Sequence, residues 1–511
     1  MNNSHNNIGL FPQMPVCDEV LHSEINSDFT LPDYKSEIKK LISTKVRILP
    51  PKQYLGNSKA NLEGEVVYKI LYVGADNSLY SATLSDKYGF DADLHFDSHS
   101  VNTDEIALHS LCECENSSTR VLGPRKINVR SKLLCRAFAL SPSIYKPELM
   151  GAHDPSCIEN LVMEAPSLVT HTCESEPISL SDVFAIDPQI DNIRIIDTCG
   201  TVLVGECQAS VDKIEVRGEA WVKILYCNDA ESEEELIMTR KLPFSTTMLC
   251  EGVDPSYECC AYGTVNEESA TVDDASVKTE LILSIHAQAQ ANKAVPYISD
   301  SFSTERAVNN EFDEVVLTKG VKAFNGNLSQ NEVFMLSDTR LDPDFKIIDT
   351  DATAKIRSSS YENGKIVLLG ECNYQLVCYS KGEYSLCELS APIKYELDQR
   401  NLAIEGETKL INGIATVVST RARCDGERIY IDSELNFCIS IKNQYKISLL
   451  KETEFGERLT HPKGCMVLCY PKEKSSLWDI AKKYGVTTHK LREKNAISES
   501  NDISKKKFIV I

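Results

Sequence analysis

Lysine residues are concentrated in the last 48 residues of the chain, where they could bind an acidic partner. Residues 464–511 contain nine Lys and one Arg against five acidic residues, a formal charge of +5, whereas the whole chain carries −21. Lys472 and Lys474 precede one apolar segment, and Lys505 to Lys507 precede the last one. A basic surface of this kind suits an acidic protein partner. The alternative is that these lysines only keep a small domain soluble.

Catalytic patterns are missing from the sequence. It contains no GxxxxGK[ST] loop, no HExxH, no GxSxG and no EF-hand pattern. His286 lies in an alternating apolar run and is interpreted as a strand residue, and His489 beside Lys490 is interpreted as solvated. Trp478 could line a sugar groove, but its helical spacing favours a core position. We therefore expect no enzyme and no catalytic, cofactor or metal residues.

The 19 cysteines are scattered along the chain and form no CxxC…CxxC set, so they do not predict zinc. Cys372 and Cys378 lie within apolar alternations, where cysteine acts as a small hydrophobe. The first residues lack the basic and apolar regions of a signal peptide. Reduced thiols in a cytosol are therefore expected.

Length and composition indicate a globular, soluble protein of three or four domains. The chain has 511 residues, of which 42% are hydrophobic and 25% charged. It has no window of 18 apolar residues, so no membrane-spanning segment is predicted. The acidic balance of the larger part argues against nucleic-acid binding.

The basic end has the pattern of a strand, two helices and a second strand. Apolar runs at 466–470 and 508–511 predict the strands. Ser476 is the expected N-cap of the first helix, with Asp479 in a capping-box position. Gly485 is expected to end that helix in a left-handed conformation, and Thr487 or Thr488 to cap the second. Leu477, Ile480, Ala481 and Tyr484 would form one face of the first helix.

The run from Ser476 to Val486, followed by Leu491 and Asn495, resembles a LysM domain. Membership implies a βααβ module, and most members bind N-acetylglucosamine polymers such as peptidoglycan. The family's ligand loops usually contain Gly-Asp-Thr and Pro-Gly-Gln, where this chain has Lys474–Ser476 and Lys505–Lys507. Replacing glycine removes the close backbone approach that sugar binding uses. The resemblance and the charge instead favour a protein partner on a loop face made of Lys472, Lys474, Ser475, Asn495, Lys505, Lys506 and Lys507.

The larger part of the chain repeats itself about every 150 residues. The segment 64–72 (GEVVYKILY) recurs at 218–226 (GEAWVKILY) and, more loosely, at 370–378 (GECNYQLVC). Segments 194–198 (RIIDT) and 346–350 (KIIDT) also correspond, as do 129–133, 277–281 and 431–435. Ordered landmarks of this kind indicate an internal repeat.

Each repeat has a β pattern. Apolar residues alternate along the three GE segments, which is the period of a half-buried strand. Polar tips at 74–77, 229–235 and 381–383 predict hairpins. The Gly-Glu step is interpreted as a bulge or close backbone approach at a strand start, rather than as a catalytic carboxylate.

The predicted fold is mainly β: three tandem antiparallel β modules, sandwich-like, followed by a small βααβ LysM domain. The expected boundaries are an N-terminal extension at 1–35, modules at 36–160, 175–300 and 325–450, and the LysM domain at 464–511. Polar, irregular segments, such as Ser299–Glu305, are expected to separate the modules.

Three such repeats followed by a LysM domain resemble the SPOCS-domain spore-coat morphogenetic proteins of clostridia. This resemblance implies a non-enzymatic scaffold in the mother-cell cytoplasm, at the forespore surface and spore coat. It also implies that the LysM domain contacts the spore-coat morphogenetic ATPase of the stage IV sporulation type, with other coat proteins as further partners. Such a scaffold would promote attachment of the coat and encasement of the forespore.

Two other functional classes remain open at the level of sequence. The chain could anchor to peptidoglycan or cortex glycan through its LysM domain. It could also be a wall hydrolase with a LysM targeting tail, although no nucleophile, metal or paired-carboxylate set supports this.

Overall fold

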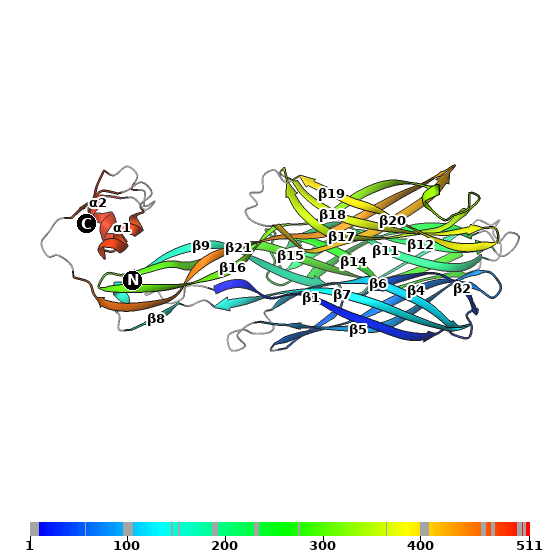
Figure 1. Ribbon diagram of the computed structural model, residues 1–511, viewed down its shortest axis with the longest axis horizontal. Coiled ribbons are helices and arrows are strands. Elements are labelled where there is room, and N and C mark those ends of the chain that lie inside the picture. Colours follow the sequence, from blue (N-terminus) through cyan, green and yellow to red (C-terminus); the bar gives the residue numbers. More distant parts are fainter. Residues whose placement is uncertain are drawn as a thin grey trace.

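Strands make up almost all of the described part of the chain, with two short helices near its end (Figure 1). The computed structural model describes residues 10–56, 58–95, 106–144, 147–151, 154–185, 193–228, 235–273, 276–363, 365–398, 408–460, 467–471, 476–497, 503 and 507–511. The strands form three repeated sandwiches and a two-stranded ribbon that accompanies the helices. The predicted mainly-β fold with a terminal βααβ domain is therefore confirmed.

The first sandwich contains two antiparallel sheets, in the orders β1-β7-β6 and β2-β4-β5, with β3 also pairing with β4. We call β2-β4-β5 and its equivalents the axis sheets, and the other sheets the long sheets. The strands of the first sandwich are β1 (Leu10–Thr30), β2 (Ile38–Ile48), β3 (Lys52–Leu55), β4 (Lys59–Gly74), β5 (Leu79–Asp93), β6 (Ala107–Gly123) and β7 (Lys126–Ile144).

The second and third sandwiches repeat this order of pairing. In the second, the axis sheet is β11-β12-β13, and the long sheet is β10-β15-β14 with β9 also on β15. In the third, they are β17-β18-β19 and β16-β21-β20. The strands are β9 (Ile158–Glu174), β10 (Ile178–Ala185), β11 (Ile193–Ser210), β12 (Lys213–Asn228), β13 (Glu235–Leu249), β14 (Glu258–Asp273), β15 (Ser276–Ser303), β16 (Arg306–Met335), β17 (Lys346–Glu362), β18 (Lys365–Ser380), β19 (Glu383–Asp398), β20 (Thr408–Asp425) and β21 (Arg428–Arg458).

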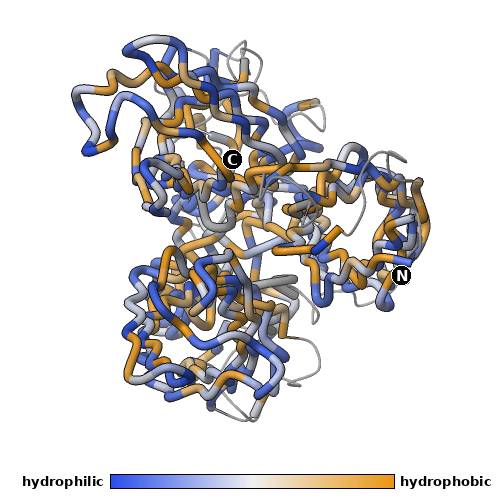
Figure 2. The backbone as a smooth tube through the Cα atoms, turned by 90° about the vertical axis from the view of Figure 1, so that its right-hand side faces the viewer, coloured by the Kyte–Doolittle hydropathy of each residue, from blue (hydrophilic) through white to orange (hydrophobic). Residues whose placement is uncertain are grey.

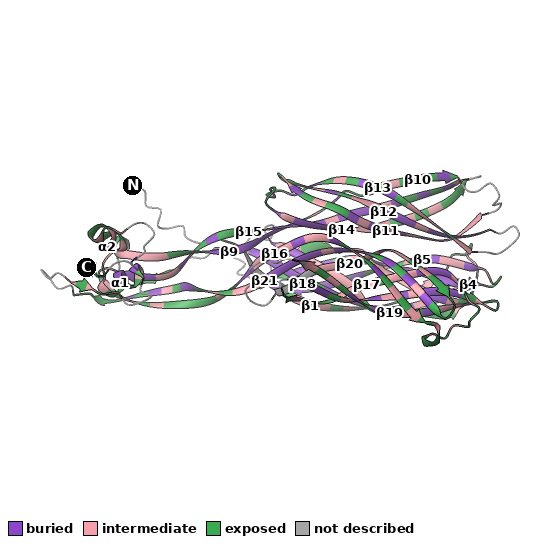
Figure 3. Ribbon diagram, turned by 90° about the horizontal axis from the view of Figure 1, so that it is seen from above, coloured by how far each residue is buried: buried purple, intermediate pink, exposed green. Residues whose placement is uncertain are grey.

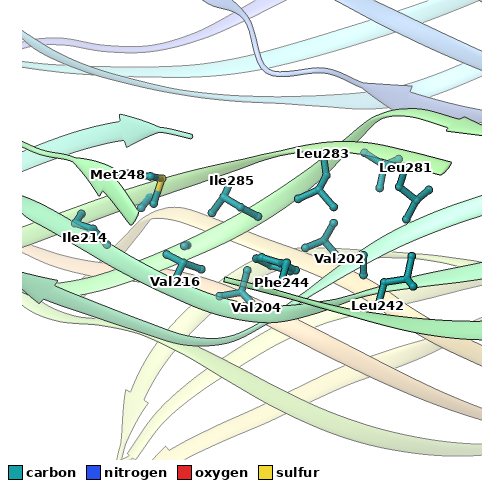
Figure 4. Packing of buried hydrophobic residues seen from close by; sticks show 14 of the residues in the cluster. Val202, Val204, Ile214, Val216, Leu242, Phe244, Met248, Leu281, Leu283 and Ile285 are labelled. Atoms are coloured by element: carbon teal, nitrogen blue, oxygen red, sulfur yellow. The ribbon is translucent and has the colours of Figure 1, made fainter. Parts of the chain in front are cut away.

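Each sandwich buries its own core between its two sheets. In the second sandwich, alternate residues of β11, β12 and β13 face alternate residues of β15 (Figure 4). Ile214 and Val216 of β12, and Leu281, Leu283 and Ile285 of β15, all have 0% exposure. Burying aliphatic side chains at this period stabilises the sandwich by about 1.5–3 kcal/mol per residue.

The repeated GE strands are the central strands of the axis sheets, and the predicted alternation is confirmed. Tyr68 and Tyr374, together with their alternating neighbours, are fully buried in the cores. The strands are not half-buried, however. Leu71, Leu225 and Val377 on the opposite faces are also buried, in a separate cluster shared by all three sandwiches.

The Gly-Glu step marks the predicted close backbone approach. A Cβ on Gly218 would lie 2.2 Å from the carbonyl oxygen of Leu203, and one on Gly370 would lie 2.3 Å from that of Lys355. The neighbouring strands also bulge opposite both glycines. The expected location at a strand start is wrong, because Gly218 lies inside β12, which begins at Lys213.

The three axis sheets meet around a common centre, so that the sandwiches form three lobes (Figure 2). The contacts follow a ring: β5 touches β11, β13 touches β17, and β19 touches β2. Equivalent residues of the repeat make equivalent bonds. Arg194 donates to the carbonyl of Leu79 at 3.0 Å, and Lys40 donates to the carbonyl of Tyr384 at 2.7 Å.

A stalk extends from one end of the three lobes (Figure 1). It is formed by β9 paired with β15 and β16 paired with β21, with the short β8 (Glu148–Met150) running parallel to β21. Ala165, Val295, Tyr297, Leu317 and Leu449 form its core. Buried and exposed residues alternate along these strands (Figure 3). The 3-10 turns Pro155–Cys157 and Leu336–Asp338 precede β9 and follow β16.

Strands form both within the predicted N-terminal extension and in the segment that is expected to separate the second and third modules. β1 lies within 1–35, the predicted extension, and pairs along its length with β7. Ser299–Ser303 completes β15, and β16 starts at Arg306. Ser299–Ser303 is polar but not exposed, because Ser301 and Ser303 are buried where β15 pairs with β9. Hairpin turns occur at the predicted tips 74–77 and 381–383, where Asn77, Lys381 and Gly382 have positive φ. Of the tip 229–235, only Glu235 lies within the described residues.

Candidate partner-binding site

The terminal domain consists of β22 (Leu468–Cys469), α1 (Leu477–Tyr484), α2 (Thr488–Asn495) and β23 (Ile509–Val510). The predicted capping box is present: the backbone N–H of Asp479 donates to Ser476 Oγ at 3.1 Å, and the Ser476 N–H donates to Asp479 Oδ2 at 2.9 Å. Gly485 ends α1 with a φ of 60°, as predicted. Thr487 caps α2 by accepting from the N–H of Lys490.

The small core of this domain includes the tip of the stalk. Leu477, Ile480, Ala481, Leu491 and Ile509 are buried together with Phe302 of β15, and Val308 of β16 packs against them. A unit of this size has little apolar surface to bury by itself. The stalk therefore completes the hydrophobic packing of the terminal domain.

Trp478 lies at this junction, where it is half-buried. Its ring packs edge-to-face on Phe302 at a centroid distance of 4.9 Å. Its Nε1–H donates to Asp300 Oδ2 at 2.8 Å. Trp478 thus docks the terminal domain on the stalk. Its spacing in the helix predicts a buried position but does not reveal this contact.

Asp300 is the main polar residue of the junction. Lys482 Nζ lies 2.6 and 2.8 Å from its two carboxylate oxygens, and Asn310 donates to Oδ1 at 3.0 Å. Burial opposes ionisation of Asp300, yet hydrogen bonds from Lys482 and Trp478 hold its pKa below the ordinary value. The carboxylate is therefore charged at neutral pH and attracts the basic domain.

Glu159 of β9 makes the second polar contact. Its Oε2 accepts from the backbone N–H of Thr488 at 3.0 Å and from Thr488 Oγ1 at 2.9 Å. The stalk thus holds the first turn of α2, where free N–H groups favour an anion. His489, the next residue, is exposed and lies 3.7 Å from Glu493, so the prediction of a solvated side chain is confirmed.

Of the seven predicted loop-face residues, only Asn495 and Lys507 lie within the described residues; Lys472, Lys474, Ser475, Lys505 and Lys506 lie outside them. Lys507 is exposed. Asn495 donates to the carbonyls of Leu491 and Val510 at 2.9 and 2.8 Å, and accepts from the Val510 N–H at 2.7 Å. It therefore ties α2 to β23. Asn495 is at the opposite end of α2 from Thr488, the residue that the stalk holds.

A buried ionic cluster, which was not predicted, fixes the three sandwiches to one another. Lys45 Nζ lies 3.0 Å from Asp351 and 3.6 Å from Asp349, and Lys223 lies 2.7 Å from Asp349. Lys69 bridges Asp197 at 3.2 Å and Glu268 at 2.6 Å, and Arg47 meets Glu268 at 3.0 Å. We call these eight residues the axis cluster.

Lys45 and Asp349 of the axis cluster stay ionised although they are buried. Burial by itself would lower the pKa of Lys45, but Asp351 and Asp349 hold that pKa well above the ordinary value. Burial would raise the pKa of Asp349, but Lys223 and Lys45 keep it low. Asp197 and Asp349 occupy the same position in the repeated IIDT segments. An Asp inside an apolar strand signals a buried partner, and this is how the sequence could have revealed the cluster.

His286 is a strand residue of β15, as predicted. It shares a hydrogen bond of 3.2 Å with Thr264 and stacks on Tyr262. Burial lowers its pKa to about 4, so its imidazole is neutral at physiological pH. The predicted apolar role of Cys372 and Cys378 is confirmed, because both are fully buried in the third core.

Comparison with known proteins identifies two domains. Residues 190–273, which contain β11 to β14, match the SipL SPOCS domain, and residues 472–511 match the LysM domain. No curated protein matches the chain. Among the residues described, no helix has the length and apolar character needed to span a membrane. Both domains are non-catalytic binding domains, and together they point to a sporulation-associated protein. The chain thus combines a SPOCS domain with a C-terminal LysM domain, the architecture of a SPOCS–LysM protein.

Proposed function

We propose that this protein is a non-enzymatic sporulation scaffold. Its LysM domain binds the spore-coat morphogenetic ATPase of the stage IV sporulation type, and the scaffold promotes coat attachment to the forespore and its encasement. It acts in the mother-cell cytoplasm, at the forespore surface and spore coat. The domain boundaries predicted from the sequence remain part of this proposal.

The position of the LysM domain is the observation that supports this proposal most directly. Phe302, Asp300 and Glu159 of the stalk hold α1 and the first turn of α2. Asn495 lies at the opposite end of α2 from Thr488 and is bonded to β23, and Lys507 is exposed. A domain held through α1 and the first turn of α2 leaves Lys507 exposed, which supports binding of an acidic partner through the basic loop face.

The lysines of the loop face favour a protein over a glycan. Lys505 to Lys507 stand where glycan-binding relatives commonly have Pro-Gly-Gln, so long charged side chains replace a surface that sugars approach closely. The junction also uses Trp478, an aromatic residue that could otherwise stack on a sugar.

The test is capture of the purified ATPase by the immobilised full-length protein. Reversing three charges with Lys505→Glu, Lys506→Glu and Lys507→Glu should weaken capture roughly tenfold or more, because opposite charges guide such interfaces. A matched variant with Lys39→Glu, Lys87→Glu and Lys126→Glu changes three exposed lysines of the first sandwich. It should capture the ATPase like the unaltered protein.

Circular dichroism of both triple variants should match the parent, because surface substitutions rarely unfold a protein. Equal capture by all three folded proteins would reject a basic loop face as the binding site.

Peptidoglycan or cortex glycan is the alternative partner, favoured by the LysM match itself. Sedimentation of the full-length protein with purified peptidoglycan tests it. Sedimentation with peptidoglycan, together with failure to capture the ATPase, would replace the scaffold proposal by a wall-anchoring function.

A further inference from the structure

The two-stranded sheet of the LysM domain has two faces with different surroundings. Cys469 of β22 and Ile509 of β23 are register partners, and both belong to the core between the sheet and the helices. Leu468 and Val510 are the neighbouring pair of register partners. Because successive side chains of a strand point to opposite faces, Leu468 and Val510 lie on the outer face, away from the two helices.

The outer face is apolar on both strands. Leu468 is 43% exposed, and Val510 is partly exposed. Tyr470 and Phe508 continue the same alternation beyond the paired positions, and they are 65% and 44% exposed. Their ring centroids lie 6.4 Å apart, so the two aromatic side chains are neighbours across the ribbon. We call Leu468, Tyr470, Phe508 and Val510 the outer patch.

An apolar outer face is unusual for a sheet that helices cover on one side only. The solvated face of such a sheet ordinarily carries polar residues. Single exposed apolar side chains are common on protein surfaces, but adjacent ones on two paired strands mark a surface that another molecule covers. Exposed aromatic residues are also enriched at the centres of protein interfaces. The composition of the outer patch is therefore that of an interface centre.

Positive charge borders the outer patch. Lys507 precedes Phe508 in the chain and is exposed. Lys494 is exposed as well, and its Nζ donates to the carbonyl of Ile511 at 3.2 Å, which places an ammonium group at the other end of β23. Residues 464–511 carry a formal charge of +5. Two copies of this domain would therefore repel each other, whereas an apolar surface with acidic residues around it would complement both the patch and its border.

We propose that the outer patch is the apolar centre of the surface through which the LysM domain binds its acidic protein partner. This inference rests on the proposed function: the partner is the ATPase, and lysines such as Lys507 form the polar rim. Buried aromatic side chains carry a large share of the free energy of binding, whereas rim charges mainly guide the encounter. Tyr470 and Phe508 should therefore contribute more to affinity than any single lysine.

The contacts with the stalk leave the outer patch accessible. Trp478 and Lys482 of α1 bond Asp300, and Thr488 of α2 bonds Glu159. These contacts come from the helices, which lie on the inner side of the sheet. A partner that covers the outer patch therefore does not need to displace the stalk.

The experiment measures capture of the purified ATPase by the immobilised full-length protein. Tyr470→Ala combined with Phe508→Ala should weaken capture about tenfold or more, because it truncates both aromatic side chains of the patch. The matched control is Val211→Ala combined with Leu249→Ala, two apolar residues of the second sandwich that are 68% and 81% exposed. This control should capture the ATPase like the parent.

Two further measurements separate binding from folding. Circular dichroism of the double variant should match the parent, and so should acrylamide quenching of Trp478 in a Trp221→Phe background, which reports docking on the stalk. Leu468→Glu is a single change at an exposed position. It should also weaken capture about tenfold, because it places negative charge opposite an acidic partner.

The possible results distinguish this inference from the proposed function. Equal capture by the parent and both folded patch variants would overturn the outer patch and leave the proposed function standing. Failure of the parent itself to capture the ATPase would overturn the proposed function, and this inference with it. If ultracentrifugation showed a dimer of the parent that Tyr470→Ala with Phe508→Ala dissociates, the patch would join two copies of this chain, and the proposal would be wrong.

Discussion

The axis cluster and the LysM junction both pair lysines with carboxylates, but in different surroundings. Lys45, Lys223 and Asp349 are almost completely buried, with side-chain exposures of 17%, 20% and 3%. Lys482 and Asp300 at the junction are 39% and 20% exposed. Coulomb attraction is much stronger in the buried surroundings, and so is the cost of leaving a charge unpaired. The sandwiches are therefore fixed to one another, whereas the LysM domain is held by contacts that solvent screens more strongly.

The largest effect is expected at the axis cluster. Asp349→Asn removes the charge that Lys45 and Lys223 share: Lys223 loses its carboxylate partner in a buried position, whereas Lys45 keeps Asp351 at 3.0 Å. The free energy of unfolding should fall by about 3–5 kcal/mol in urea titration. Asp338→Asn, at an exposed carboxylate after β16, should change it by about 0.5 kcal/mol or less.

If Asp349→Asn and Asp338→Asn lowered the free energy of unfolding equally, the strong contribution assigned to the buried axis cluster would be contradicted. Such a result would mean that the axis cluster is neutralised by solvent and that hydrophobic contacts alone hold the sandwiches together.

A smaller effect is expected at the junction. Asp300→Asn weakens the contact with Lys482 and reduces the hydrogen bond from Trp478, so the LysM domain should leave the stalk more often. Global stability should change by about 1 kcal/mol or less, but acrylamide should quench Trp478 fluorescence more strongly. The measurement uses a Trp221→Phe background, because Trp221 is the second of the two tryptophans. Asp342→Asn, at the exposed pair with Lys381, provides the control.

The smallest and most gradual effect is expected when the pH is lowered, and it concerns docking of the LysM domain on the stalk. The pKa of Asp300 in the docked state lies below its ordinary value of 3.8. The contribution of Asp300 to docking is therefore fully present above pH 3.8. It is lost as the pH falls through the lower pKa of Asp300 in the docked state. Quenching of Trp478 should increase over this acid range in the parent. It should stay constant in Asp300→Asn, and a parallel increase in that variant would assign the change to other groups.

The sequence predicted the elements that depend on local patterns. The alternation around Tyr68 and Tyr374, the capping box of Ser476 and the turn at Gly485 each follow from neighbouring residues, and each is present. The repeat likewise predicts three similar modules, but it does not predict the contacts between them.

The remaining features depend on contacts between distant residues. Lys45 and Asp351 lie in different sandwiches, and no spacing in the sequence relates them. The stalk could not be predicted because Ser299–Ser303 is polar in sequence, whereas Ser301 and Ser303 are buried by contacts with distant strands. Asn495 remains a predicted loop-face residue, and its amide also holds α2 to β23, a contact that the sequence does not reveal.

Hydrogen exchange of the full-length protein, alone and with the purified ATPase, tests the central claim most directly. If the LysM domain stays on the stalk and binds through its loop face, the ATPase should slow exchange at 472–475 and 503–507. Exchange at 158–163, 298–303 and α1 should then remain unchanged. Slower exchange along α1 with faster exchange at 298–303 would show that the partner displaces the stalk, and it would contradict the account.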